Sequence, residues 1–168
     1  MTELWIAGGL LVAVVLGVAG WRMRYPYKAQ KRLFTNAEWR FYQHLERAIG
    51  GSHLVMAKVR IADVLTVHGR RSQTRGWWRA FTRISSKHID FIICDRDNGT
   101  ILCGIELDDR SHFRGDRRRR DRFVNGAFEK AGLPLLRYPV QRRGYDIHGL
   151  RRSVLQAIAA ARPQGGIA

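Results

Sequence analysis

Two short apolar segments, each with one carboxylate and separated by a turn, limit the fold of this chain more than any other feature. Residues 88–94 read HIDFIIC and residues 100–107 read TILCGIEL. The DNG sequence at 97–99 favours a tight turn, because Asn-Gly readily adopts the positive φ angles of hairpin turns. The pattern predicts an antiparallel hairpin that brings Asp90, near the start of one strand, to the same end as Glu106, near the end of the other.

The length of the hairpin loop determines whether these two carboxylates share a face of the sheet. A two-residue loop at 98–99 would place them on opposite faces, because side chains alternate along a strand. A three-residue loop at 97–99, with Gly99 in the left-handed region as a bulge, would pair Asp90 with Glu106 on one face. We expect the bulged form.

Carboxylates are concentrated in this region although the chain is strongly basic. The net charge is +16, yet eight of the fourteen acidic residues lie between 90 and 121. Hard oxygen ligands within a basic surface suit a divalent cation that acts on a phosphodiester. The basic surplus indicates a polyanionic partner, either nucleic acid or an anionic membrane surface, although a merely solvated surface is the alternative. With only two cysteines, a disulfide framework and a four-cysteine zinc site are excluded.

An uncharged run at residues 4–21 suggests a separate N-terminal segment. Eighteen residues is the short end of what spans a bilayer as a helix, and basic residues follow the run. The positive-inside rule then predicts a single-pass anchor in the inner (cytoplasmic) membrane, with the N-terminus outside and the domain in the cytoplasm. A cleaved signal peptide is less favoured, because its positive charge would precede the apolar run. We expect a transmembrane anchor at 4–21, a basic linker at 22–33, a folded domain at 34–161 and a disordered tail at 162–168.

The folded domain shows an alternation of helix and strand patterns. Thr35 and Glu38 form a capping-box pattern that predicts a helix ending near residue 49. Residues 66–83 have no clean period and are interpreted as a basic, aromatic excursion. The other expected elements are strands at 53–64, 88–94, 100–107 and 133–138, and helices ending near 131 and spanning 147–161. This order predicts an α/β sandwich around a mixed sheet.

Several segments together carry a family resemblance. They are LFTNAE at 33–38, KVRIADV at 58–64, RISSKHIDF at 83–91, IELDDRSH at 105–112, RD at 120–121 and AGLPLLR at 131–137. In this order they resemble the domain-of-unknown-function family 2726, over about residues 33–140. That family is similar to the PD-(D/E)XK nuclease superfamily, near the very-short-patch-repair endonucleases in motif order. The resemblance implies a restriction-endonuclease-like α-β-β-β-α-β sandwich with a mixed sheet, in which carboxylates on the second and third strands bind magnesium.

The resemblance also implies roles for single residues. Asp90 and Glu106 would be the metal-binding carboxylates on the second and third strands, and Glu38 matches the glutamate of the first helix. The lysine position of the motif holds Asp108, which joins the candidate metal ligands. Asp108 could instead pair with arginines, and Glu38 is needed for the capping box in any case.

The substituted lysine raises the question of which group replaces it. Lys87, Lys58 or His112 would have to supply the missing positive or proton-transferring group. His112 is the most plausible acid or base, because the pKa of an unperturbed histidine lies near neutrality. His112 could equally well cap a loop.

Candidate contacts to nucleic acid are arginines and aromatic residues. Arginines are the residues that neutralise phosphates, and the candidates are Arg117, Arg118, Arg119, Arg120, Arg70 and Arg71. Trp77, Trp78 and Phe81 could stack on unpaired bases, but we favour core packing for them.

The sequence therefore predicts a membrane-anchored hydrolase that cleaves phosphodiester bonds in DNA or RNA with Mg²⁺ or Mn²⁺. The alternative is a non-catalytic nucleic-acid-binding module tethered to the inner face of the membrane, which the Asp108 substitution favours. A third possibility is that the basic patches near the linker bind lipid head groups alone.

Overall fold

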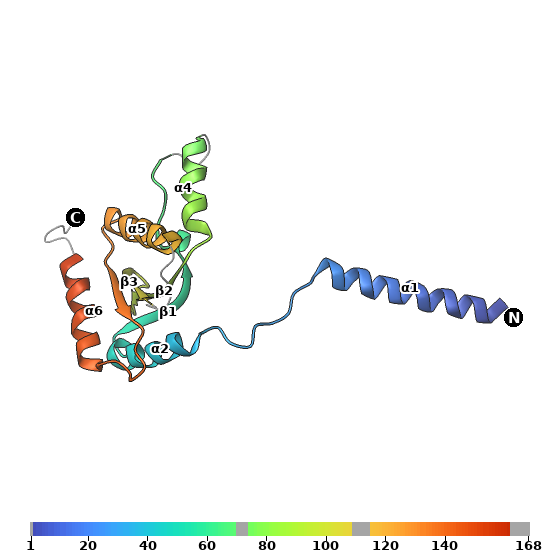
Figure 1. The fold of residues 1–168 in the computed structure, drawn as a ribbon, viewed down its shortest axis with the longest axis horizontal. Coiled ribbons are helices and arrows are strands. Elements are labelled where there is room, and N and C mark those ends of the chain that lie inside the picture. The colour runs from blue at the N-terminus through green and yellow to red at the C-terminus, as the bar shows by residue number, and fades with distance from the viewer. Residues whose placement is uncertain (1, 70–73, 109–114, 162–168) are drawn as a thin grey trace. The chain divides into compact units, whose positions relative to one another are not determined.

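The computed structural model describes residues 2–69, 74–108 and 115–161, and the chain divides into two units, residues 1–33 and 34–168. The first unit holds helix α1 (Thr2–Arg24) and an irregular segment that follows it (Figure 1). The sequence predicted a helix here, and one is present. The predicted tail at 162–168 lies outside the described residues.

The expectation that residues 4–21 form a membrane anchor is wrong. Within the part of the chain that the structure describes, no helix combines the length and apolar character that crossing a bilayer requires. The run is at the short end of the range, and four of its positions are glycines, which add almost no apolar side-chain surface. The described residues therefore form a mixed α/β fold in which no helix could cross a membrane.

The second unit is built around a four-stranded mixed sheet in the order β1-β2-β3-β4. Strands β1, β2 and β3 pair antiparallel, whereas β4 runs parallel to β3. The strands are β1 (His53–Arg60), β2 (His88–Asp95), β3 (Ile101–Asp108) and β4 (Leu135–Pro139). The helices are α2 (Asn36–Ile49), α3 (Ile61–Val64), α4 (Arg75–Ser85), α5 (Gly115–Lys130) and α6 (Ile147–Ala161).

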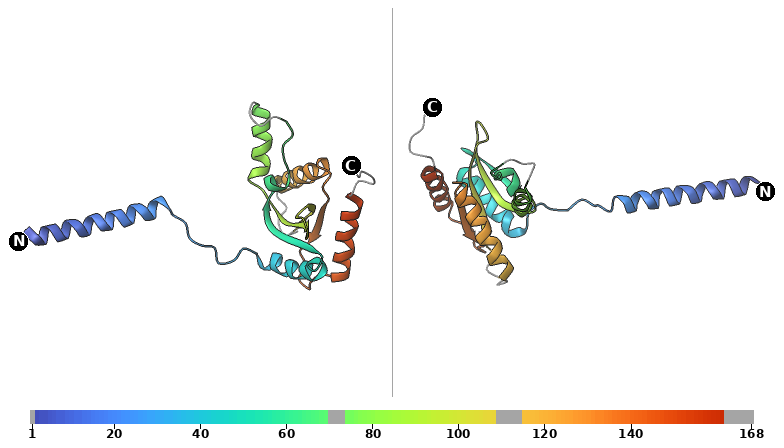
Figure 2. Two further views of the ribbon diagram at one scale, coloured as in Figure 1. Left: turned by 180° about the vertical axis from the view of Figure 1, so that it is seen from behind. Right: turned by 90° about the horizontal axis from the view of Figure 1, so that it is seen from above.

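Helices cover both faces of the sheet (Figures 1 and 2). On one face, α2 and α6 pack against the strands through a cluster that includes Phe41, Phe91 and Val154. On the other, α3, α4 and α5 contribute to a second cluster that includes Ile92 and Phe128. The two clusters give the sandwich an apolar core on each side of the sheet, as its order of elements predicted.

Gly104 on β3 allows α5 to approach the sheet closely. A Cβ atom at this position would lie 2.7 Å from Cε1 of Phe128 on α5 and 3.1 Å from Cδ1 of Leu135. Real Cβ atoms do not come this close to ring atoms, so only glycine fits without a shift of the helix. This contact places α5, and the charged residues of its first half, beside β3.

Two elements differ from the sequence prediction. The strand expected at 53–64 ends at Arg60, and the chain continues as the short helix α3. The segment at 66–83, interpreted as an irregular excursion, contains helix α4. The hydroxyl of Thr74 caps this helix by accepting a hydrogen bond from the Trp77 backbone N–H, at 3.2 Å. Trp77, Phe81 and the buried Ile84 follow at spacings of four and three residues, which place them on one face of a helix. This spacing was the signal that could have predicted α4.

Candidate active site

The register between β2 and β3 places the two predicted carboxylates on one face of the sheet. Phe91 lies opposite Ile105, so Asp90 and Glu106 are the next pair in the same register. Side chains opposite each other in antiparallel strands share a face, about 5 Å apart at Cβ. Continued by one residue, this register gives the predicted pairing of Asp90 with Glu106, although the regular ladder ends at Phe91 and Ile105.

The hairpin reaches this register by a different route from the one expected. The loop spans four residues, 96–99, and the backbone N–H of Asp95 donates to the carbonyl of Thr100 at 2.8 Å. Gly99 is in the left-handed region with φ of 73°, as predicted. A shift of register between Ile93 and Cys94 then restores the pairing beyond it. A bulge is present, but it lies within the strands and not in a three-residue loop.

Asp90 interrupts the hydrogen-bond ladder between its strand and β3. Its Oδ2 accepts a hydrogen bond of 2.9 Å from the backbone N–H of Leu107. Burial raises the pKa of Asp90, and the charge of Glu38 adds to this, whereas the Leu107 N–H, Lys58 and Arg120 lower it. The net effect is a raised pKa, so the carboxylate is held in a site that disfavours its charge.

Glu106 is the only charged residue among the buried side chains of the described part, with 6 % of its surface exposed. Its Oε1 atom is buried and has no hydrogen-bond partner among the described residues. Burial and then the neighbouring Asp90 raise its pKa to about 7, although Arg120 and Arg137 oppose the shift. A buried carboxyl oxygen without a partner is costly, so this atom marks a position where a ligand would be stabilising.

Lys58 approaches this pair from the edge strand β1. Its neighbours Ala57 and Val59 pair with Phe91 and Ile89, which sets Lys58 across from Asp90. Lys58 is in the left-handed region, with φ of 55°, and it is the one non-glycine residue with a positive φ in the described chain. Strained backbone of this kind is concentrated at functional sites.

The ammonium group of Lys58 forms an ion pair with Glu38 on α2, at 2.5 Å. Glu38 is also the capping-box partner of Thr35, whose backbone N–H donates to it at 2.8 Å. Burial alone would raise the pKa of Glu38, but the hydrogen bonds from Lys58 and Thr35 and the Lys58 charge lower it below its usual value. The predicted capping role of Glu38 is confirmed, whereas its predicted catalytic role stays a prediction.

The other two candidates for replacing the missing lysine are Lys87 and His112. Lys87 donates a hydrogen bond of 2.6 Å to the carbonyl of Arg83, and its ammonium lies 5.5 Å from the ring centre of Phe123. These contacts direct it toward α4 and α5. His112 lies outside the described residues. Of the two candidate lysines, Lys58 is the one that lies near the carboxylates.

Asp108, at the lysine position of the motif, pairs with Arg137 of β4 at 2.6 Å. The same guanidinium lies 3.9 Å from Glu106 and 3.5 Å from Asp121 of α5, and it donates to Asn125 at 3.0 Å. Arg137 therefore places a permanent positive charge beside Asp108 and Glu106. The sequence analysis assigned it no role, although an arginine within an apolar strand indicates a buried partner.

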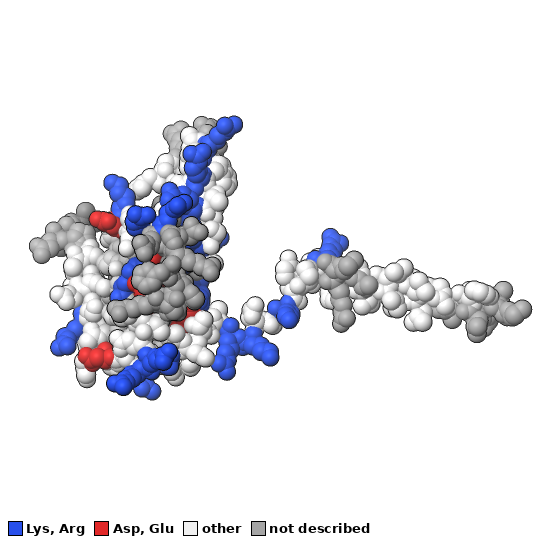
Figure 3. Space-filling view, in the orientation of Figure 1, with Lys and Arg blue, Asp and Glu red and all other residues white. Residues whose placement is uncertain are grey.

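The predicted arginine contacts are only partly described. Arg119 and Arg120 are exposed on α5, and Arg120 donates to the carbonyl of His88 at 3.5 Å. Arg70 and Arg71 lie outside the described residues, as do the side chains of Arg117 and Arg118. Three further arginines, Arg75, Arg79 and Arg83, lie on α4, and blue atoms mark this region of the surface in Figure 3, which has the orientation of Figure 1.

The candidate metal ligands do not form a complete cage of protein groups. In the ranges that the structure describes, no group of three or more His, Cys, Asp or Glu side chains is arranged to hold a metal. Asp90 and Glu106 are the two that could share a cation, and Asp108 is held by Arg137. Mg²⁺ commonly binds proteins through one or two carboxylates, with waters and substrate phosphates completing its coordination.

The family model described as "Protein of unknown function (DUF2726)" matches residues 30–158. The chain belongs to the DUF2726 family. The match covers the elements from α2 to most of α6, so the whole candidate site lies in the DUF2726 domain, whereas α1 precedes it. Neither the search of curated proteins nor the search of solved structures found a match. Similarity to the PD-(D/E)XK superfamily is not part of the family match and stays a prediction.

Proposed function

We propose that this DUF2726 protein is a metal-dependent nuclease that hydrolyses phosphodiester bonds in DNA or RNA. The observation that carries the proposal is the buried Glu106 beside Asp90, because its Oε1 has no hydrogen-bond partner among the residues that the structure describes. Two neighbouring carboxylates with raised pKa values are more stable when a cation neutralises them. The cationic groups nearby, on Arg120 and Lys58, suit an anionic substrate.

Asp90 and Glu106 would hold Mg²⁺ or Mn²⁺, which would stabilise charge on the phosphate and lower the pKa of a bound water. The protein side chains would position the cation and the phosphate and would supply charge near them. The Leu107 N–H fixes one oxygen of Asp90, and the other, which has no hydrogen bond within the described ranges, would face the cation. Lys58, held by Glu38, would place its ammonium near the phosphate as the motif lysine would.

A second function is favoured by one observation. Asp108 replaces the lysine of the motif and is neutralised by Arg137, which cannot transfer a proton because guanidinium groups do not lose theirs in proteins. A domain that binds nucleic acid without cleaving it is consistent with this pair. A nuclease would cut the nucleic acid that it binds, whereas a binding domain would leave it intact.

The proposal is tested by incubating the full chain with single- and double-stranded DNA and RNA, with Mg²⁺, Mn²⁺, Ca²⁺ or no metal. Cleavage should require Mg²⁺ or Mn²⁺ and be abolished by Glu106→Gln and by Asp90→Asn, which keeps an acceptor for the Leu107 N–H. The matched controls are Glu129→Gln and Asp97→Asn, the same changes at exposed positions. Binding without cleavage of any substrate would favour the second function.

A further inference from the structure

A pocket of about 240 Å³ lies between α4, α5 and the segment 65–68, on the face of the sheet that α3, α4 and α5 cover. Its walls are mainly apolar, and they include Leu65, Val67 and Phe123. An apolar cavity of about 150 Å³ accommodates a benzene molecule. The pocket is therefore large enough for a planar heterocyclic ring.

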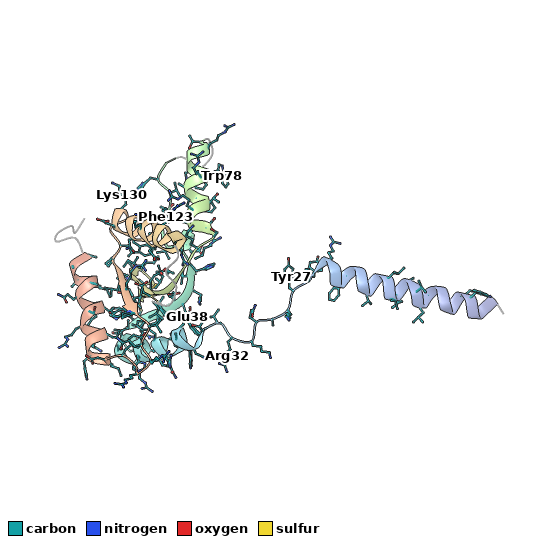
Figure 4. All side chains as sticks on the ribbon, in the orientation of Figure 1. Tyr27, Arg32, Glu38, Trp78, Phe123 and Lys130 are labelled. Atoms are coloured by element: carbon teal, nitrogen blue, oxygen red, sulfur yellow. The ribbon has the colours of Figure 1, made fainter. Side chains whose placement is uncertain are left out.

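The charged and titratable side chains that line the pocket are all potential cations. They are His68, Arg83 and Lys130, and the lining contains no carboxylate. The guanidinium of Arg83 lies 4.1 Å from the ring centre of Phe123, in position for a cation–π contact. Figure 4 shows Phe123 and Lys130 on α5 and Trp78 on α4. An apolar pocket with a cationic rim fits a ligand that has a flat apolar part and an attached anion.

A second hollow, of about 220 Å³, shares the segment 65–67 with the pocket. Trp77 and Phe81 of α4 line it, and their rings stack with centres 5.1 Å apart and planes inclined by 12°. Trp78 beside them is 55 % exposed. Aromatic side chains next to basic residues are the surface on which single strands stack their bases.

Helix α5 joins the pocket to the candidate active site. Arg120 affects the pKa values of both candidate carboxylates, and Ala127, seven residues later, lines the pocket. At 1.5 Å per residue, this is a separation of about 10 Å along the helix axis. A stacked strand advances about 3.4 Å per nucleotide, so about three nucleotides cover this distance and fewer do so when unstacked.

From these relations we infer that the pocket holds an unpaired base of the substrate, about one to three nucleotides from the cleaved bond. The inference rests on the proposed function and narrows its substrate to nucleic acid with a single-stranded segment. The base lies between the apolar walls, and Arg83 and Lys130 contact the phosphates on either side of it. A paired base presents no free face to such a pocket, so fully double-stranded substrate binds less tightly.

The experiment compares the affinity of the full chain for one fluorescent strand, alone and as a duplex, in EDTA so that no cleavage occurs. Ala127→Leu fills the pocket without changing charge and should weaken binding of the single strand about tenfold while leaving the duplex unchanged. Ala159→Leu, the same change at an exposed position of α6, is the control and should alter neither. Thermal melting of both variants shows whether the fold is retained.

A second measurement uses the unmodified protein and does not depend on the variant folding. Photo-crosslinking to a single strand that contains 5-iodouracil should attach it to peptides from α4 or α5. Crosslinks elsewhere, or an equal loss of affinity for single strand and duplex, overturn the pocket assignment and leave the nuclease proposal standing. Absence of binding to any nucleic acid overturns both.

Discussion

The backbone N–H of Leu107 donates its hydrogen bond to the side chain of Asp90, at 2.9 Å. A side chain thus occupies the place of a backbone acceptor at the end of the β2–β3 ladder, whose last regular pair is Phe91 with Ile105. On the other side of β2, the left-handed Lys58 interrupts the ladder to β1 at the same level. One oxygen of Asp90 is therefore fixed in orientation, and the other has no hydrogen bond to the residues that the structure describes.

Ionisation of Glu106 should make the stability of the protein depend on pH. Its pKa is about 7 in the folded chain, against 4.5 as the usual value. Between these values the folded state binds more protons than the unfolded state, so the free energy of unfolding falls as pH rises from about 4.5 to 7 and is then constant. The contribution is on the order of 3 kcal/mol.

Thermal melts at pH 5 and pH 8 check this expectation. Glu106→Gln should gain stability relative to the unmodified chain as pH rises, whereas Glu129→Gln, at an exposed position, should follow the unmodified chain. Mg²⁺ at pH 8 should raise the melting temperature of the unmodified chain but not of Glu106→Gln. Parallel pH profiles for Glu106→Gln and the unmodified chain would contradict the raised pKa.

Substitutions of Lys58 should affect both the stability of the fold, through its positive φ, and the rate of cleavage, through its ammonium group. A side chain at positive φ destabilises the fold by about 1 kcal/mol, so Lys58→Gly should be more stable than Lys58→Ala by about this amount. In an ordinary strand the order is reversed, because glycine is the less stable residue. Urea denaturation measures the difference. Both variants should cleave at least about a hundredfold more slowly, and unchanged cleavage would remove Lys58 from the site.

Arg137 should contribute more to stability than an exposed arginine. Arg137→Met leaves Asp108 and two further carboxylates without their shared cation, and it should lower the free energy of unfolding by about 3 kcal/mol. Arg142→Met, at an exposed position, should change it by less than about 0.5 kcal/mol. Denaturant titrations of the two variants test this. Equal losses would show that the Arg137 ion pairs are weak.

Arg119 should contribute to nucleic-acid affinity by contacting a backbone phosphate. If its exposed side chain contacts a phosphate, Arg119→Gln should reduce the slope of log affinity against log salt concentration by about 0.7 to 0.9. Arg152→Gln, on the opposite face of the sheet, is the control. Affinity measured over a series of salt concentrations gives both slopes, and an unchanged slope for Arg119→Gln would assign this residue to the solvated surface.

Local sequence determined the elements whose stabilising contacts are short in range. Thr35 and Glu38 are three residues apart, and their capping box sets the start of α2 as predicted. Alternation of apolar residues and the turn signal at Gly99 were sufficient for the hairpin, whereas its register depends on a bulge between Ile93 and Cys94 that the sequence did not predict. These features depend on hydrogen bonds and side-chain directions within a few residues, which the order of residues records directly.

The tertiary structure decided which charged groups meet. The sequence offered Lys87 and Lys58 equally, but only the packing of β1 against β2 and α2 brings Lys58 to Glu38, twenty residues away. Arg137 reaches Asp108 across 29 residues because β4 lies parallel to β3, and no local pattern specifies that neighbour. Ion pairs of this kind depend on the order and direction of strands in the sheet, which arise from packing of the whole domain and not from local sequence.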